Sequence, residues 1–386
     1  MQIETVETFI VGNPWKNWIF LVLRTDDGIE GVGEATVPFV ARAVEAAIHD
    51  LKRFYVGRDP ADIEAIWQTI ARIGRMGPIH MAVLAGLEMA CLDIRGQVEG
   101  KPVCALLGQK PVERVPLYAN GWYQGPREPS SFAERARDVV ARGYRALKFD
   151  PFGSAYRNIP PAELDRAVEI VAAVRDAVGE GADVCIEGHW RFTPEQAVEV
   201  ARRLEPFRPL WFEEPVPSKE IEQLAWVRER VAVPLATGEH LLDALEFRRL
   251  LDAGACDYIQ PDLLHVGGFR RTLEIAQMAA ERGVRVAPHQ AEGPVASVAN
   301  VHLASVLPGF CIQEMFDEFA VPWRHDLLDR PVEICDGCAL VPTRPGLGVT
   351  FNREAARRHP FDPAAGLPLF EDGWETRGLG RAGNGQ

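Results

Sequence analysis

The sequence predicts an α/β protein: a TIM-type (β/α)8 barrel joined to an α+β capping domain that is formed from the N-terminal region and the C-terminal segment. Three observations lead to this prediction. Short apolar runs alternate with helix-like stretches from about residue 116 to residue 314. Three successive runs end in a glutamate, and Glu187, Glu213 and Glu239 follow one another at intervals of 26 residues. The first 115 residues have a different pattern, in which strand-like segments come first and helices follow.

The predicted barrel contains eight strands separated by helices. The stretches between strands carry apolar residues at helical spacing, as at residues 130–142, and a proline stands near the start of 161–178, as is typical of a helix N-terminus. The strands are expected at residues 116–120, 146–149, 183–187, 210–213, 234–239, 257–260, 284–287 and 310–313. A repeat of roughly 25 residues is the length of one βα unit, so residues 116–330 are predicted to form a closed barrel.

Residues 1–115 are predicted to form the capping domain. We expect strands at residues 4–11, 19–24 and 31–34 with a turn at Asp27-Gly28, followed by helices at 39–55, 60–72 and 79–98. Residues 331–386 are too few to fold alone, so we expect this third segment to pack on the capping domain. Its last residues, 377–386, are rich in glycine and are predicted to be disordered.

Composition excludes several classes of protein. The chain of 386 residues has a formal net charge of −13, which leaves no basic surface for nucleic acid. No apolar run approaches the length of a membrane span, and the first residues have neither the basic nor the apolar region of a signal peptide. The seven cysteines are scattered and odd in number, which is typical of a reduced cytoplasmic protein.

The close pair Cys335 and Cys338 allows two interpretations. The pair could be a redox or zinc motif, or it could flank the turn Asp336-Gly337 of a β-hairpin. Strand-like residues lie on both sides, at 332–334 and 339–341, and no second Cys/His pair has zinc-ligand spacing. We therefore favour the hairpin.

The three glutamates predict a metal site. In a parallel barrel the C-terminal ends of the strands meet at one edge, so Glu187, Glu213 and Glu239 are expected to lie close together. Carboxylates clustered without a cation would repel one another and their pKa values would rise. Oxygen ligands suit a hard divalent ion, so we expect one Mg²⁺ per subunit.

Several short motifs, each weak by itself, stand in an order and spacing that is highly specific. They are Ala146-Leu-Lys148-Phe-Asp150, Glu187-Gly-His189, Phe212-Glu213-Glu214-Pro215, Thr237-Gly238-Glu239, Gln260-Pro-Asp262, Ala287-Pro-His289, Gln313-Glu314 and Pro345-Gly-Leu-Gly348. Together they resemble the enolase superfamily, mandelate racemase subgroup, over nearly the whole chain. Enzymes of this kind use a Lys or His base and Mg²⁺ to abstract a proton next to a carboxylate.

The resemblance implies roles for particular residues. It makes Glu187, Glu213 and Glu239 the metal ligands, although the first of these is usually aspartate in the family. It makes His289 the base, with Asp262 orienting its imidazole, as in other His–carboxylate pairs. A further residue, Glu314, matches one that hydrogen-bonds the substrate carboxylate opposite the metal.

Two positions indicate which reaction follows proton abstraction. Racemase-like members carry Lys-x-Lys on the second strand, whereas this chain has Lys148 and Asp150, and inversion needs an acid/base on each face. Members similar to galactonate dehydratase carry a histidine where this chain has His189, which protonates the departing hydroxyl. The resemblance therefore implies an acid-sugar dehydratase, a lyase, that forms a 2-keto-3-deoxy acid. The alternatives are an epimerase, racemase or lactone cycloisomerase in which Lys148 or Asp150 is the second acid/base, and a non-catalytic sugar-acid binder.

Other residues are candidates for contact with the substrate, which the resemblance implies is a small sugar acid. Lys148 would balance charge or bind the substrate carboxylate. The remaining candidates are Asp150, Arg191, His240, Trp15 and Asn17. Members of this family are often dimers or octamers, so the resemblance also implies a homo-oligomer.

Overall fold

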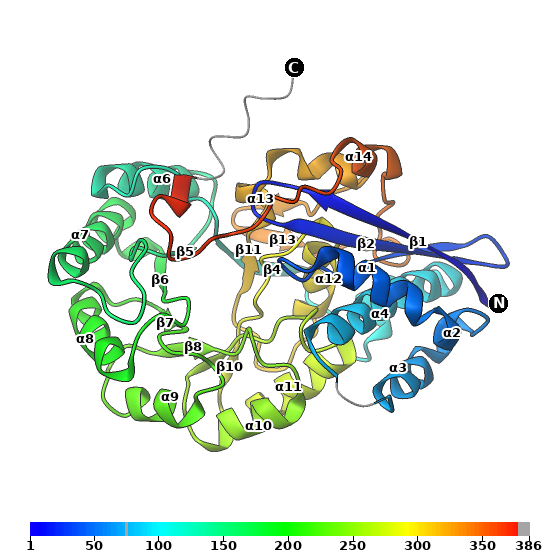
Figure 1. Cartoon of the computed structure of the whole chain (residues 1–386), viewed down its shortest axis with the longest axis horizontal. Coiled ribbons are helices and arrows are strands. Elements are labelled where there is room, and N and C mark those ends of the chain that lie inside the picture. The colour runs from blue at the N-terminus through cyan, green and yellow to red at the C-terminus, as the bar shows by residue number, and fades with distance from the viewer. Residues whose placement is uncertain (74–75, 377–386) are drawn as a thin grey trace.

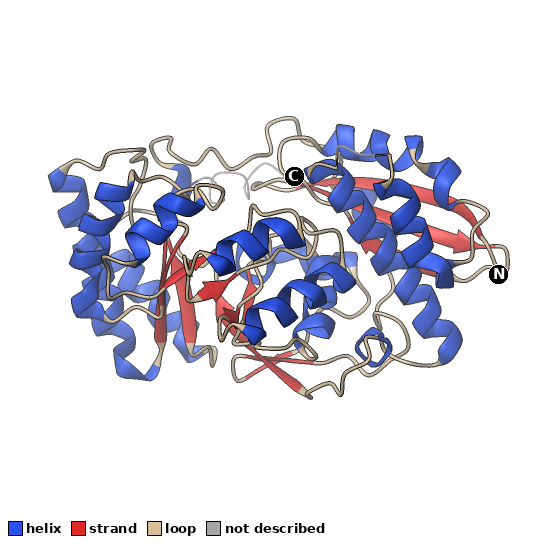
Figure 2. Cartoon of the chain, turned by 90° about the horizontal axis from the view of Figure 1, so that it is seen from below, coloured by secondary structure: helices blue, strands red, loops and turns tan. Residues whose placement is uncertain are grey.

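The computed structural model of this chain describes residues 1–73 and 76–376. A ring of helices encloses short strands on the left of Figure 1, and a long antiparallel sheet lies to the right. Figure 2 shows the same two parts side by side, with helices packed against the antiparallel sheet. The predicted combination of a parallel barrel and an α+β capping domain is confirmed, whereas the domain boundaries at residues 115 and 330 stay predictions.

The capping sheet has the strand order β1-β2-β3, with antiparallel pairing throughout. Its strands are β1 (Ile3–Gly12), β2 (Asn17–Thr25) and β3 (Glu30–Glu34). The long helix α4 (Pro78–Glu99) packs directly on β3. A Cβ atom on Gly33 would lie 1.9 Å from the carbonyl oxygen of Gly86, so glycine is required where the strand and the helix meet.

The other helices of the capping region are short. The predicted helix at 39–55 is divided into two shorter helices by Leu51, which caps the end of the first and precedes the second. The remaining elements are α1 (Ala41–Asp50), α2 (Lys52–Tyr55), a 3-10 turn at Pro60–Asp62, α3 (Ile63–Ala71) and α5 (Val103–Leu106). None of the helices in the described ranges is long and apolar enough to cross a membrane.

The barrel strands are parallel, and neighbours in the chain are neighbours in the sheet from β4 to β10. They are β4 (Arg114–Ala119), β5 (Ala146–Phe149), β6 (Asp183–Glu187), β7 (Trp211–Glu213), β8 (Leu235–Thr237), β9 (Tyr258–Ile259), β10 (Arg285–Val286) and β11 (Gln313–Met315). The last strand, β11, pairs with β4, and a parallel bridge between Val286 and Phe310 joins β10 to the residues before β11. These two contacts complete the ring.

Helices cover the outside of the ring, one after most strands. They are α6 (Pro129–Ala141), α7 (Pro161–Val178), α8 (Pro194–Leu204), α9 (Ile221–Arg228), α10 (Ala244–Asp252), α11 (Phe269–Glu281), α12 (Pro294–Ala304) and α13 (Asp317–Ala320). The interior is filled by a layer of side chains from successive strand segments: Tyr118, Ala146, Cys185, Trp211, Ala236, Tyr258 and Ala287. Because these side chains fill the barrel interior, a ligand site is expected at the C-terminal ends of the strands.

The C-terminal segment contacts both parts of the molecule. The hairpin of β12 (Ile334–Cys335) and β13 (Cys338–Leu340) forms as predicted, with Cys335 opposite Cys338, and both thiols are free. Strand β13 pairs antiparallel with β4 of the barrel, while α14 (Arg353–Arg358) lies against β1. The glycine-rich residues 377–386, predicted to be disordered, lie outside the described residues.

Candidate active site

Three glutamates converge at the C-terminal ends of β6, β7 and β8. Glu187 is opposite Glu213 in the parallel pairing of β6 and β7, and Glu239 follows β8 by two residues. One carboxylate oxygen from each lies within 4.8 Å of the others, and all three residues are buried. The barrel geometry thus brings together the three carboxylates that the equal sequence spacing singled out.

The electrostatics of this cluster fit a divalent cation. Burial and the neighbouring charge of Glu187 raise the pKa of Glu213 well above its ordinary value. The ammonium of Lys148 pairs with two of these carboxyl groups, those of Glu187 and Glu213. All three glutamates offer carboxylate oxygens as metal ligands, and oxygen ligands are those that a hard divalent ion prefers. The residues therefore fit the divalent metal that enolase-superfamily members bind.

Lys148 lies at the centre of the acidic cluster. Its Nζ is 3.1 Å from Oε2 of Glu187 and 2.9 Å from Oε1 of Glu314, and it also contacts Glu213. Burial lowers the pKa of Lys148, but the carboxylates of Glu213 and Glu314 outweigh this effect and hold the pKa well above its ordinary value. Asn120 Nδ2 donates to Oε1 of Glu314 at 2.7 Å. Glu314 therefore holds the lysine in place and is itself held from β4.

A first histidine–aspartate pair lies beside Glu239. His289 Nδ1 is 2.7 Å from Oδ2 of Asp262, and the His289 Nε2 is 3.5 Å from Oε2 of Glu239. The other oxygen of Asp262 accepts hydrogen bonds from the backbone N–H groups of Leu264 at 2.7 Å and His265 at 3.1 Å. Burial lowers the pKa of His289, but the surrounding carboxylates, Glu239 first, raise it overall to about 10.

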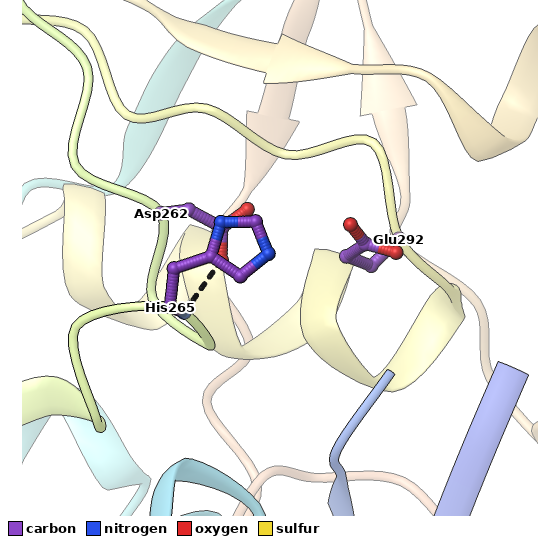
Figure 3. A group of neighbouring side chains, drawn as sticks. All are labelled: Asp262, His265 and Glu292. Atoms are coloured by element: carbon purple, nitrogen blue, oxygen red, sulfur yellow. Dashed lines mark hydrogen bonds between the residues drawn. The ribbon is translucent and has the colours of Figure 1, made fainter. Parts of the chain in front are cut away.

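Asp262, His265 and Glu292 form a second group that could in principle hold a cation (Figure 3). The hydrogen bonds around them indicate another role. Both oxygens of Asp262 already accept hydrogen bonds, and Nδ1 of His265 is 2.7 Å from the backbone oxygen of Glu239. Glu292 forms a buried ion pair with Lys16, at 3.3 Å. We therefore interpret the group as support for the His289 pair.

A second histidine–aspartate pair lies on the other side of the glutamates. His189 Nδ1 is 2.7 Å from Oδ2 of Asp150, the residue that replaces the second lysine of racemase-like members. Oδ1 of Asp150 accepts a hydrogen bond from the Phe152 backbone N–H at 2.8 Å. The guanidinium of Arg191 also contacts Asp150 and donates to the carbonyl of Gly153 at 2.7 Å. Asp150 is thus fixed from three directions.

An unusual backbone presents His189 to the cavity. His189 and Trp190 both have positive φ angles, 46° and 48°, in the left-handed region that non-glycine residues rarely adopt. The conformation lets the His189 N–H donate to Glu187 Oε1 at 2.7 Å and the Trp190 N–H donate to the Glu214 carbonyl at 2.6 Å. Such backbone strain is concentrated at functional sites, where the surrounding structure maintains it.

A small cavity of about 60 Å³ lies among these groups and adjoins a larger one of about 590 Å³. The smaller cavity is lined by Lys148, Glu187, His189, Glu239 and His289, and by residues of other elements. Those are Trp15, Lys16, Asn120, Gly121, Tyr123, Gln124, Ala291, Phe316, Leu367, Trp374 and Glu375. The larger cavity has a mainly apolar wall that includes Phe39, Trp190 and Phe370.

Not every predicted contact residue lines these cavities. Trp15 lines both cavities and His240 lines the larger one, as expected for contact with a substrate. The side chain of Asn17 instead donates to the Asp362 carbonyl at 2.9 Å and ties β2 to the C-terminal segment. Asp150 and Arg191 are fully buried beneath His189, where they hold its ring. A strand position alone does not distinguish a residue that faces the cavity from one that supports it.

Sequence reasoning missed the contribution of residues 367–376, here called the C-terminal strap. The strap crosses the barrel beside β5 and α6, and brings Leu367, Trp374 and Glu375 to the small cavity (Figure 1). Its anchors include a hydrogen bond from Trp374 Nε1 to the Gly153 carbonyl at 3.2 Å. No sequence signal indicates this contact, because the strap is more than 200 residues from the loop it covers.

Comparisons with known proteins follow the same division of the chain. Residues 8–108 match the family described as mandelate racemase / muconate lactonizing enzyme, N-terminal domain. Residues 131–355 match the family described as enolase C-terminal domain-like. Together these matches cover most of the sequence.

Two relatives of known name cover most of this chain. D-gluconate dehydratase of Thermoproteus tenax is 39% identical over 373 residues, which are 95% of this chain and 75% of the relative. D-galactonate dehydratase of Xanthomonas euvesicatoria pv. vesicatoria (strain 85-10) is 36% identical over 353 residues, which are 90% of this chain and 92% of the relative.

Solved structures show the same fold. The mandelate racemase/muconate lactonizing enzyme from Sulfitobacter sp. aligns with a TM-score of 0.89 and 34% identity, covering 96% of this chain and 98% of that one. The corresponding protein from Jannaschia sp. CCS1 aligns with a TM-score of 0.87 and 34% identity, covering 94% and 98%.

Proposed function

We propose that this chain, which belongs to the mandelate racemase/muconate lactonizing enzyme family of the enolase superfamily, is an acid-sugar dehydratase. The observation that carries the proposal is the pair of histidines on opposite sides of the three glutamates, each with Nδ1 at 2.7 Å from an aspartate. Dehydration needs one group that removes a proton and another that returns a proton to the leaving hydroxyl. The named relatives act on D-gluconate and D-galactonate, which are sugar acids.

Glu187, Glu213 and Glu239 would hold the metal, and we propose Mg²⁺ because the donor set consists only of carboxylate oxygens. When bound, a divalent cation stabilises the negative charge that develops on the substrate carboxylate as the α-proton leaves. Lys148 borders the same place and would pair with the substrate carboxylate, while Glu314 holds the lysine in position.

His289 would remove the proton from C2 through Nε2 in its neutral form. A cation held by Glu239 would favour that form, because it would offset the carboxylate charge that raises the pKa of His289. The other ring nitrogen is occupied by Asp262, which fixes the ring orientation and stabilises the imidazolium that forms. His189 would then deliver a proton from Nε2 to the hydroxyl on C3, with its Nδ1 held by Asp150. The C3–O bond breaks, water leaves, and a C2–C3 double bond forms. The resulting enol tautomerises to a 2-keto-3-deoxy acid.

The surroundings of Lys148 and Asp150 weigh against an isomerase. An epimerase or cycloisomerase would use one of these residues as a second acid/base. Lys148 contacts three carboxylates that keep its ammonium charged, and Asp150 is fully buried behind His189. Neither residue therefore offers a free base to the opposite face of C2. The homo-oligomer implied by family resemblance stays a prediction.

A screen of aldonic and aldaric acids with Mg²⁺ tests the proposal. Semicarbazide would detect 2-keto-3-deoxy products, and ¹H NMR in D₂O would detect exchange at C2. We expect a ketone from one or a few acids. Exchange at C2 without a ketone would move the assignment to an isomerase. The absence of both reactions, together with demonstrated Mg²⁺ and acid binding, would indicate a non-catalytic binder.

A further inference from the structure

We infer that Glu375, on the C-terminal strap, binds a hydroxyl group of the substrate beyond C3 and makes the enzyme prefer aldonic acids over aldaric acids. This inference rests on the proposed function and concerns the same site. Its starting point is one side chain that the mechanism above does not use.

The strap holds Glu375 in a defined position. The Gly125 N–H donates to the Glu375 carbonyl at 3.0 Å, and Ser154 donates to Asp372 on the same strap. The neighbouring Trp374 packs edge-on against the ring of His189, with ring centroids 6.1 Å apart. These contacts fix the position of the strap relative to His189, the histidine of the second histidine–aspartate pair.

One oxygen of the Glu375 carboxyl group lacks a hydrogen-bond partner. The residue is only 4% exposed, and its Oε1 has no hydrogen-bond partner among the described residues 1–73 and 76–376. A buried oxygen without a donor is unfavourable, because it has lost its hydrogen bonds to water. Burial raises the pKa of Glu375 and the nearby charge of Asp150 adds to this, although Arg127 and Arg191 act in the opposite direction. A donor from a bound molecule would satisfy the oxygen.

The position of Glu375 indicates which donor this would be. Glu375 lines the small cavity together with His189, Lys148 and Glu187. The C3 hydroxyl is assigned to His189, so the donor at Glu375 would come from a carbon farther along the chain. Water can also enter this place, because a cavity of about 60 Å³ exceeds the space that one water molecule needs. A polyhydroxylated chain would displace that water.

The charge of Glu375 adds discrimination to binding. A hydroxyl donates to a carboxylate, whereas a second carboxylate at the far end of the substrate cannot donate and would be repelled. An aldaric acid keeps the hydroxyls at C4 and C5 and differs only at C6, where a carboxylate replaces the hydroxyl. The discrimination therefore rests on repulsion between that carboxylate and Glu375. An aldonic acid should therefore be preferred to the aldaric acid of the same configuration.

The test compares matched substrate pairs, D-gluconate with D-glucarate and D-galactonate with galactarate, on the Mg²⁺-loaded full chain. We expect Glu375→Gln, whose amide oxygen still accepts a hydrogen bond, to lower kcat/KM for the preferred aldonic acid roughly 3- to 10-fold, mainly through KM. The same substitution should leave or raise kcat/KM for the aldaric partner. Glu375→Asp, which keeps the charge, should retain most of the preference. Asp372→Asn, on the same strap but outside the small cavity, is the matched control. Its ratio of kcat/KM for the aldonic acid to kcat/KM for the aldaric acid should stay within about twofold of that of the unaltered chain.

Several outcomes would overturn the inference. If Glu375→Gln lowers kcat/KM equally for the aldonic and the aldaric acid of a pair, the carboxylate does not select the substrate. The same conclusion follows if Asp372→Asn lowers the ratio of the two kcat/KM values as much as Glu375→Gln does. Calorimetric binding of the same four acids extends the test to variants with no turnover, and thermal melting identifies variants that do not fold. If the unaltered chain neither binds nor converts any of the acids, the proposed function fails first and this inference falls with it.

Discussion

Nδ1 of His189 lies 2.7 Å from Oδ2 of Asp150, the same separation that joins Nδ1 of His289 to Oδ2 of Asp262. The two pairs come from different strand ends, after β5 and β6 on one side and after β9 and β10 on the other. Each aspartate leaves Nε2 of its histidine available for proton transfer.

Asp150→Asn should impair dehydration and spare proton abstraction. The amide cannot hold the imidazolium of His189 as a carboxylate does, so we expect kcat to fall about 10²- to 10⁴-fold. Exchange of the C2 proton in D₂O, followed by ¹H NMR, should continue at nearly the original rate. Loss of exchange in parallel with dehydration would show that Asp150 supports the whole site and not the acid alone.

Asp262→Asn and His289→Asn should abolish both reactions. Without an oriented base at C2, neither exchange nor ketone formation is expected above about 1% of the original rate. The measurement is the same NMR experiment, with Asp150→Asn as the contrasting variant. Retention of C2 exchange in His289→Asn would assign the base to another residue.

Removal of divalent metal should lower both activity and stability. At a free Mg²⁺ concentration of 100 times Kd, binding to the folded chain adds about 2.7 kcal/mol to the free energy of unfolding. We expect EDTA to lower the Tm, Mg²⁺ to restore it, and Glu213→Gln to remove most of the response. Glu195→Gln, an exposed position at the start of α8, is the matched control and should respond like the unaltered chain. An equal change of Tm with Mg²⁺ in both variants would contradict the assignment of Glu213 as a metal ligand.

Glu34 links the capping domain to the loop that follows His289. Its carboxyl group accepts hydrogen bonds from the Gly293 N–H at 2.7 Å and the Ala296 N–H at 2.9 Å, which cap the first turn of α12. Glu34→Ala would leave both donors unpaired, so we expect a loss of about 1–3 kcal/mol in the free energy of unfolding by urea denaturation. The control Glu45→Ala, on α1, removes a half-buried carboxyl group that accepts a hydrogen bond from Thr8 Oγ1 at 3.0 Å. An equally small effect in both variants would mean that the cap is not important for stability.

Glu34 should also make the free energy of unfolding depend on pH. Burial raises the pKa of Glu34 to about 8, from 4.5, so the folded chain binds more protons than the unfolded chain between these values. The contribution of Glu34 to stability is therefore fully present below about pH 4.5 and is lost as pH rises through about 8. Glu34→Gln, which cannot ionise, should have a flatter stability profile over this interval. An unchanged profile would show that Glu34 does not titrate there.

Much of the site could be predicted because parallel strands bring their C-terminal ends to one edge. The predicted strands at 146–149 and 183–187 coincide with β5 and β6, and the three glutamates converge as their spacing indicated. The bounds of the eighth strand were less accurate: it was expected at 310–313, whereas pairing with β4 runs from Gln313 to Met315 and includes Glu314. The apolar run before it makes only a single bridge, at Phe310.

What the sequence by itself determined is what repeats locally: the alternation of strand and helix, the glutamate at each of three strand ends, and the order of motifs that identifies the family. Only the tertiary structure decided which neighbours these groups have. It turned Asp150 toward His189, placed Glu34 at the start of α12 and brought Glu375 to the cavity. Local patterns set the secondary structure, because they act between residues close in the chain. Contacts between distant segments depend on how the domains and the strap pack, and no spacing in the sequence records that packing.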